Sequence, residues 1–249
     1  MARVLRTCLR SLYEVVSEAI SYEVIVVDTP SDDGAEEMVR GEFPGVRFVS
    51  DPTRGLAYAR NRGIAESRGR HVLHLDSDTV ILEGSFERLV SFMDEHPECA
   101  AAGAKLMNVD RTLQYSCRRF YTLPAILWRR TPLGKWFPNG APVRRHLMMD
   151  WDHDEVREID WMLAAGFIMS RPAIEALGPF DVGYEYAFED VDWCLRAWQA
   201  GWKIFYVPDA PIVHEWQRTS AKLNRTALLH LRSALRFYRK FGLVGPLTP

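Results

Sequence analysis

Cysteine is scarce in this sequence, and a long hydrophobic run is absent. The 249 residues include four cysteines, at positions 8, 99, 117 and 194. Their spacing fits no zinc-binding pattern, and so few cysteines do not make a disulfide framework. The longest apolar stretches, such as Met162–Met169, are much too short to span a bilayer, and the N-terminus lacks the apolar core of a secretory signal. We therefore expect a cytoplasmic location, with peripheral contact at the inner face of the cell membrane left open.

A surplus of one charge sign is also absent. The sequence contains 31 Lys and Arg against 33 Asp and Glu, which gives a formal net charge of -2. No broad basic field points to nucleic acid, so a nucleic-acid partner is not expected. The hydrophobic share of 47% and the charged share of 26% are typical of a globular protein. The length predicts a single domain over residues 1–249.

Short apolar runs alternate with helical patterns over residues 1–110. Tyr22–Val27 and His71–Leu75 are apolar on both faces, which is typical of strands buried in a parallel sheet. This alternation predicts an α/β domain whose ligands bind at the carboxyl ends of the strands. The other elements expected here are helices at Gly34–Arg40, Leu56–Ser67 and Ser85–His96 and a strand at Ala100–Lys105.

Residues 111–218 have a different pattern. They include a proline-containing segment with a basic set and an acidic set, 118–158, which predicts an irregular insertion. The elements expected after it are a strand at Trp161–Ser170, a helix at Glu189–Ala200, a strand at Trp202–Val207 and, within a helical tail over 219–249, a helix at Thr219–Phe241.

Asp76-Ser77-Asp78 follows the HVLHL strand directly. Two aspartates one residue apart at a strand end can hold a divalent cation that neutralises a nucleotide diphosphate. The alternative is a capping turn between strand and helix. His214 follows a later strand, and a shell of carboxylate and imidazole would suit Mn²⁺ or Mg²⁺. For a single histidine at such a position, a structural role is the alternative.

Glu189 and Asp190 open the predicted helix at Glu189–Ala200. The apolar neighbours Phe188 and Val191 could raise a carboxylate pKa and suit it to proton abstraction. The alternative is that the acids complement the helix dipole. Arg60 offers a fork of hydrogen-bond donors that could bind a phosphate or a nucleobase. The alternative is that it is an ordinary charged residue on the solvated face of a helix.

All eight tryptophans lie between positions 128 and 216. Their rings could stack on sugars, and Trp161 and Trp193 lie nearest to the candidate chemistry in sequence. For any single tryptophan, filling the core is the alternative.

Five segments in order resemble one family, glycosyltransferase family 2, the inverting transferases of the GT-A fold. Within this family the sequence is most similar to bacterial rhamnosyltransferase-like members that build cell-surface glycans. The segments cover most of residues 22–242: YEVIVVDTPSDDG, GLAYARNRGIAESRGRHVLHLDSD, WMLAAGFIMSRPAIEALGPFD, FEDVDWCLRAWQAGWKIFYVPDAPIVH and LRSALRFYRKFG.

The resemblance implies a mixed, mostly parallel sheet flanked by helices, and a metal-dependent transfer of a sugar from a nucleotide diphosphate. The donor would be a dTDP- or UDP-sugar, with rhamnose as a candidate, and the acceptor a glycan or lipid-linked sugar. The implied roles are nucleobase contact by Asp28, a nucleotide pocket from Arg60 and Asn61, ribose and metal contact by Asp76, metal ligation by Asp78 and His214, close approach of a sugar at Gly166, acceptor contact by Glu189 and proton abstraction by Asp190.

The sequence departs from the family pattern at its start. ARVLRTCLRSL resembles the helix that follows the family's first strand, so that strand is missing, and Pro30 stiffens the turn after Asp28. A non-catalytic scaffold that binds nucleotides or glycans is therefore one alternative function. A sugar nucleotidyltransferase is the other, although the Gly-rich phosphate loop that it would need near the N-terminus is absent.

Overall fold

The computed structural model describes residues 1–215 except 18, 31, 54, 131–133 and 135, together with residues 225–245 and 247. Its helices are α1 (Ala2–Val15), α2 (Ala35–Glu42), α3 (Leu56–Glu66), α4 (Ser85–Glu95), α5 (Leu123–Arg130), α7 (Ala141–His146), α8 (Arg171–Leu177), α9 (Glu189–Gln199) and α10 (Arg225–Phe241). Its strands are β1 (Ile25–Asp28), β2 (Arg47–Ser50), β3 (His71–Leu75), β4 (Thr79–Ile81), β5 (Cys99–Met107), β6 (Cys117–Arg118), β7 (Arg157–Glu158), β8 (Trp161–Met162), β9 (Gly166–Ser170) and β10 (Lys203–His214).

The main sheet is mixed, with strand order β3-β9-β5-β10-β4 and β7 paired to β10. β9 runs antiparallel to both β3 and β5, and β5 runs parallel to β10. Consequently β3, β5 and β10 share one direction, and their carboxyl ends lie at the same edge of the sheet. This mixed α/β architecture confirms the predicted fold class.

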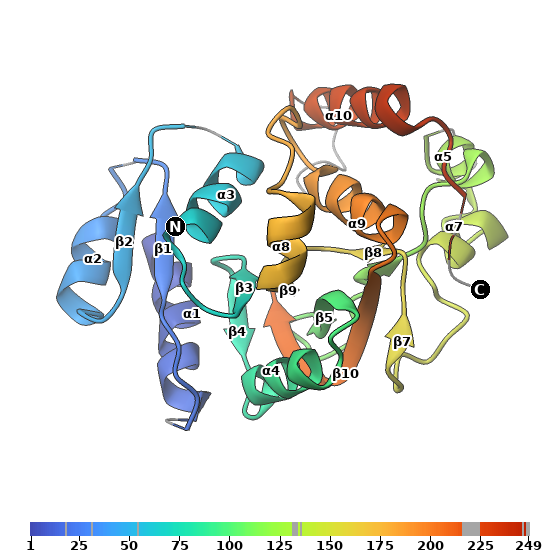
Figure 1. Ribbon diagram of the computed structural model, residues 1–249. Coiled ribbons are helices and arrows are strands. Elements are labelled where there is room, and N and C mark those ends of the chain that lie inside the picture. The colour runs from blue at the N-terminus through green and yellow to red at the C-terminus, as the bar shows by residue number, and fades with distance from the viewer. Residues whose placement is uncertain are drawn as a thin grey trace.

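β1 and β2 form a separate parallel pair. Among the described residues, no strand pairing joins this pair to the main sheet. Figure 1 shows the pair beside α1, α2 and α3, apart from β3 and β4. The first element of the described structure is α1.

Helices cover both faces of the main sheet (Figure 1). Leu89 and Met93 of α4 pack on one face, against the small side chains of β5 such as Ala102. On the other face, residues of α8 and α9, including Trp193, pack in the largest cluster of buried residues. Gly103 of β5 is needed there, because a Cβ would lie 1.5 Å from the Met162 sulfur.

Several sequence predictions need correction in residues 111–218. The 118–158 insertion is not irregular throughout, because it contains α5, α7 and the short strands β6 and β7. The expected strand at Trp161–Ser170 is divided into β8 and β9, and the last strand continues past two prolines to His214 through a register shift between Val207 and Pro211. The strands β2 and β4 were not predicted from the sequence. Residues 219–224 of the predicted tail helix lie outside the described residues, and α10 occupies the remainder.

Candidate active site

A cluster of two carboxylates and an imidazole forms where β3 ends and the chain turns back into β4. The backbone N–H and the hydroxyl of Thr79 donate to the Asp76 carbonyl at 3.1 and 2.7 Å, which closes the turn. Thr79 pairs with His214 at the end of β10, so the register brings the imidazole to the turn. His214 Nε2 lies 3.9 Å from Asp76 Oδ2 and 3.5 Å from Asp78 Oδ1. One ligand atom of each of these three residues lies within 4.8 Å of the others, so they can share a metal ion.

Gln114 fixes the imidazole of His214 in one tautomer. Its Nε2 donates to Asn108 Oδ1 at 3.1 Å and to the His214 carbonyl at 3.3 Å. Its Oε1 therefore faces His214 Nδ1, at 2.7 Å, and Nδ1 carries the proton. The lone pair of Nε2 then points toward the two aspartates, as metal ligation requires. No sequence signal identified Gln114, which lies 100 residues from its partner.

Arg60 connects this cluster to the acidic pair of α9. Its guanidinium forms an ion pair with Glu189 and lies 3.5 Å from Asp76 Oδ1. The Arg60 side chain is 11% exposed, which excludes a solvated helix charge. Burial alone would lower the pKa of Arg60, but the carboxylates of Glu189, Asp76 and Asp190 together raise it. Arg60 therefore stays charged between the two corners of the site, which are the strand-end cluster at Asp76 and the buried acidic pair at Glu189.

Glu189 and Asp190 begin α9 after two residues in the left-handed region. Ala187 and Phe188 have φ angles of 57° and 74°, which non-glycine residues rarely adopt. Only 2% of Glu189 and 7% of Asp190 are exposed. Burial, and then the charge of Glu189, raises the pKa of Asp190 to about 7. A carboxylate with this pKa is suited to accept a proton near neutral pH.

His74, on β3, is a half-buried group near Arg60 that the sequence analysis did not select. Burial and the Arg60 charge lower the pKa of His74 to about 3, so its imidazole is neutral. The ring meets Phe180 edge-on at 5.5 Å, and Nε2 has no hydrogen-bond partner among the described residues. A histidine inside an otherwise apolar strand was the available signal.

Asp28 and Asn61, the two other residues predicted to bind the nucleotide, lie at a strand end and beside a loop. Asp28 ends β1, where burial and the charges of Asp33 and Glu36 raise its pKa. Asn61 holds a loop, because its amide donates to the Phe180 carbonyl at 2.8 Å and accepts from the Phe180 N–H at 2.9 Å. Both ends of its amide are engaged by protein, so Asn61 supports the site through the segment that leads to α9.

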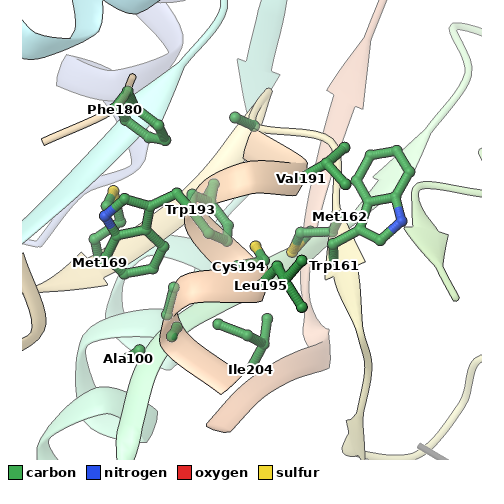
Figure 2. Packing of buried hydrophobic residues seen from close by; sticks show 14 of the residues in the cluster. Ala100, Trp161, Met162, Met169, Phe180, Val191, Trp193, Cys194, Leu195 and Ile204 are labelled. Carbon is green, nitrogen blue, oxygen red and sulfur yellow. The ribbon is translucent and has the colours of Figure 1, made fainter. Parts of the chain in front are cut away.

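The tryptophans and the glycine predicted at the sugar are core residues. Trp193 is fully buried and its indole N–H donates to the Gly178 carbonyl. Trp161 is 4% exposed. Figure 2 shows the two indoles on opposite sides of α9 among packed apolar side chains. A Cβ at Gly166 would lie 3.1–3.2 Å from side chains of Leu106, Ala104 and Ile212, so this glycine serves packing within the sheet. None of the three offers a free surface in this structure, and the sugar contacts of Trp161, Trp193 and Gly166 stay a prediction.

A mainly apolar cavity of about 500 Å³ lies between α5 and α7 rather than at the metal-type cluster. Phe120, Pro124 and Pro142 line it, together with Arg119 and Arg145. A run of ring contacts leads from it toward the acidic pair: the ring centroid of His146, in the cavity wall, lies 4.4 Å from that of Tyr121, and the Tyr121 ring stacks on Phe188 at 5.4 Å. The cavity therefore adjoins the buried corner of the site.

The family model "Glycosyl transferase family 2" matches residues 2–149, and the model "Glycosyltransferase (GlcNAc)" matches residues 132–233. The first match covers more than half of the sequence, so the chain belongs to glycosyl transferase family 2. This confirms the resemblance found in the sequence.

Curated relatives and solved structures agree with this assignment. The chain is 26% identical over 205 residues to N-acetylglucosaminyl-diphospho-decaprenol L-rhamnosyltransferase of Mycobacterium tuberculosis, a match that covers 77% of this chain and 66% of the relative. It is 25% identical over 224 residues to human polypeptide N-acetylgalactosaminyltransferase 13, which covers 86% of this chain and 40% of the relative. The chain thus spans two thirds or less of these relatives.

Two solved glycosyltransferases share the fold. GalNAc-T7 with UDP, GalNAc and Mn²⁺ superposes with a TM-score of 0.63 at 16% identity, over 94% of this chain and 47% of that one. The mannosyltransferase PcManGT from Pyrobaculum calidifontis, in complex with GDP-Man and Mn²⁺, superposes with a TM-score of 0.63 at 18% identity. This match covers 100% of the present chain and 63% of the PcManGT chain.

Proposed function

We propose that this chain transfers a sugar from a nucleotide diphosphate to an acceptor hydroxyl, with inversion at the anomeric carbon and dependence on a divalent metal. The observation that carries the proposal is the bridge formed by Arg60. It joins a cluster suited to a cation, at Asp76, to a buried acidic pair suited to proton transfer, at Glu189. A displacement of this kind needs both functions within one site.

The donor atoms of the strand-end cluster fit a divalent cation. Asp76 and Asp78 supply carboxylate oxygens, and Gln114 sets His214 in the tautomer that presents a lone pair. When bound, Mn²⁺ or Mg²⁺ would neutralise the diphosphate. Arg60 adds a positive charge that does not depend on the metal.

Asp190 is the proposed general base. It accepts the proton of the acceptor hydroxyl as the oxygen forms a bond to the anomeric carbon. The bond from that carbon to the diphosphate breaks in the same step, and the nucleotide diphosphate leaves with the electron pair. Glu189 forms an ion pair with Arg60, and after burial its negative charge is the main cause that raises the pKa of Asp190.

Relatives suggest the substrate classes. The mycobacterial relative is named for transfer of rhamnose to a lipid diphosphate that carries N-acetylglucosamine. We propose a dTDP- or UDP-linked donor, with rhamnose as the first sugar to test, and an acceptor of the lipid-linked or glycan type. Asp28 at the end of β1 is the proposed nucleobase contact. The cavity beside α5 combines apolar walls with Arg119 and Arg145, which suits part of a lipid diphosphate.

Calorimetric titration tests the proposal first. UDP, dTDP and GDP are titrated into the protein with and without Mn²⁺, and the nucleotide that binds selects the sugar donors for turnover assays. Metal-dependent binding followed by release of nucleoside diphosphate supports the transferase. Binding without turnover on any acceptor would favour a scaffold, and release of pyrophosphate would favour a nucleotidyltransferase.

A further inference from the structure

The outward face of α10 carries a stripe of leucines. The helix buries Ser233 and Phe237, which are 2% and 1% exposed, against the body of the protein. Leu228, Leu231 and Leu235 lie three and four residues apart on the opposite side and are 52%, 48% and 48% exposed. Single exposed leucines are ordinary, but three in register form a continuous apolar surface, here named the leucine stripe.

Cationic side chains flank the leucine stripe. The α10 sequence, RTALLHLRSALRFYRKF, contains no Asp or Glu. Arg236 pairs with Asp181 at 3.0 Å and ties the helix to the protein. Arg232 and Arg239 are exposed, and Arg232 lies 3.8 Å from the exposed Glu185. At 100° per residue, Arg232 and Arg239 lie on the edge of the stripe, between it and the anchored side.

The segment after α10 leads toward α5 and also exposes apolar side chains. The Asp160 carboxylate accepts from the backbone N–H of Phe120 at 2.7 Å and of Leu247 at 3.2 Å, so the end of the chain lies against the segment that leads into α5. Figure 1 shows the chain passing from α10 down beside α5 and α7. The exposed apolar residues of these segments are Leu123 (50%), Leu127 (53%), Leu243 (67%) and Leu247 (49%).

We propose that the leucine stripe, with Arg232 and Arg239, docks the protein on the surface of an anionic lipid bilayer. Leucines would enter the boundary between headgroups and acyl chains, and arginines would contact the lipid phosphates. A second copy of the chain fits this face less well, because it would bring the same cations against themselves. In the described part of the chain, no helix is long and apolar enough to cross a membrane.

Vesicle sedimentation tests the docking surface without any donor sugar, so its outcome is separate from that of the transferase assay. The full chain is mixed with phosphatidylcholine vesicles that contain or lack phosphatidylglycerol. The wild-type protein is expected to sediment with the anionic vesicles. Leu228→Ser, Leu231→Ser and Leu235→Ser combined should weaken this binding about a hundredfold or more, and Arg239→Gln about fivefold.

A matched control changes exposed apolar residues elsewhere. Val109 and Val156 are 67% and 45% exposed, and Val109→Ser with Val156→Ser should leave vesicle binding unchanged. Thermal melts should show that all variants are folded, since every substituted residue is at the surface. The proposal is overturned if wild-type protein ignores anionic vesicles, or if the triple leucine variant binds them as well as wild type. It is also overturned if the triple variant only converts a dimer to a monomer in analytical ultracentrifugation.

Discussion

The two acidic corners of the site differ in construction and in their contact with solvent. Asp76 and Asp78 lie in a turn at the end of a strand, and their side chains are 39% and 18% exposed. Glu189 and Asp190 start a helix and are almost entirely buried. Accessible carboxylates can exchange water for a cation, although partial burial also raises the pKa of Asp78. Near-complete burial raises the pKa of Asp190 to about 7. The same residue type is therefore suited to cation binding at one corner and, in our proposal, to proton transfer at the other.

The largest effect is expected on kcat, when the proposed base of the buried corner is removed. Asp190→Asn removes the base but keeps the size of the side chain, so kcat should fall about 10²–10⁴-fold while donor binding stays near wild type. Turnover and calorimetric donor binding are measured on the same preparation. Glu185→Gln is the control, because this carboxylate is 56% exposed and lies outside the site. Near-full activity of Asp190→Asn would show that another group takes the proton.

The corresponding change at the other corner should affect metal and nucleotide together. His214→Ala removes one of the three candidate ligands, so Mn²⁺-dependent nucleotide binding should weaken and turnover should fall about 10²–10³-fold. Titration of Mn²⁺ at fixed nucleotide measures the change. If His214→Ala keeps the wild-type dependence on Mn²⁺, the imidazole is not a ligand and the cluster is a structural turn.

Gln114 tests whether the tautomer of His214 matters. Gln114→Leu removes the acceptor for the Nδ1 proton, and metal affinity should fall about 10–100-fold with no direct loss of a ligand. Gln114→Glu retains the acceptor for Nδ1 but loses the donor to Asn108 and to the His214 carbonyl, so it should restore part of the affinity. Equal loss in both variants would instead indicate that Gln114 only supports packing around His214.

The pH dependence of turnover reports the buried corner. Because the pKa of Asp190 is raised to about 7, the base is increasingly protonated below that pH. Turnover should therefore fall about tenfold per pH unit below pH 7 and reach a plateau above it. Nucleotide and metal are kept saturating during the measurement. A profile that remains flat down to about pH 5 would assign the base to a group with an ordinary carboxylate pKa.

Local features of the site were readable from the sequence. The apolar run before Asp76 predicted a strand end, and the apolar neighbours of Asp190 indicated that its pKa could be raised, because each pattern lies within a few consecutive residues. The contact between Gln114 and His214 was not readable, since the two residues are 100 positions apart in the sequence and only the folded chain brings them together. The burial of Trp193 was not readable for another reason: the sequence does not distinguish an indole in the core from one on a surface, and the packing of α9 decides it.

The last expected effect is on the free energy of unfolding. It reports the buried corner in the absence of substrate. The pKa of Asp190 is raised from 3.8 to about 7, so the folded state binds this proton more tightly than the unfolded state does. The stabilisation from Asp190 is complete below about pH 4 and is lost as the pH rises through about 7. Asp190→Asn does not ionise, so its stability relative to wild type should rise by roughly 1–4 kcal/mol across this window. Urea denaturation at about pH 5 and pH 8 measures the difference, with Glu185→Gln again as the control. If the stability difference between Asp190→Asn and wild type does not change with pH, Asp190 titrates as an ordinary carboxylate. The proposed role of the buried pair in proton transfer would then be wrong.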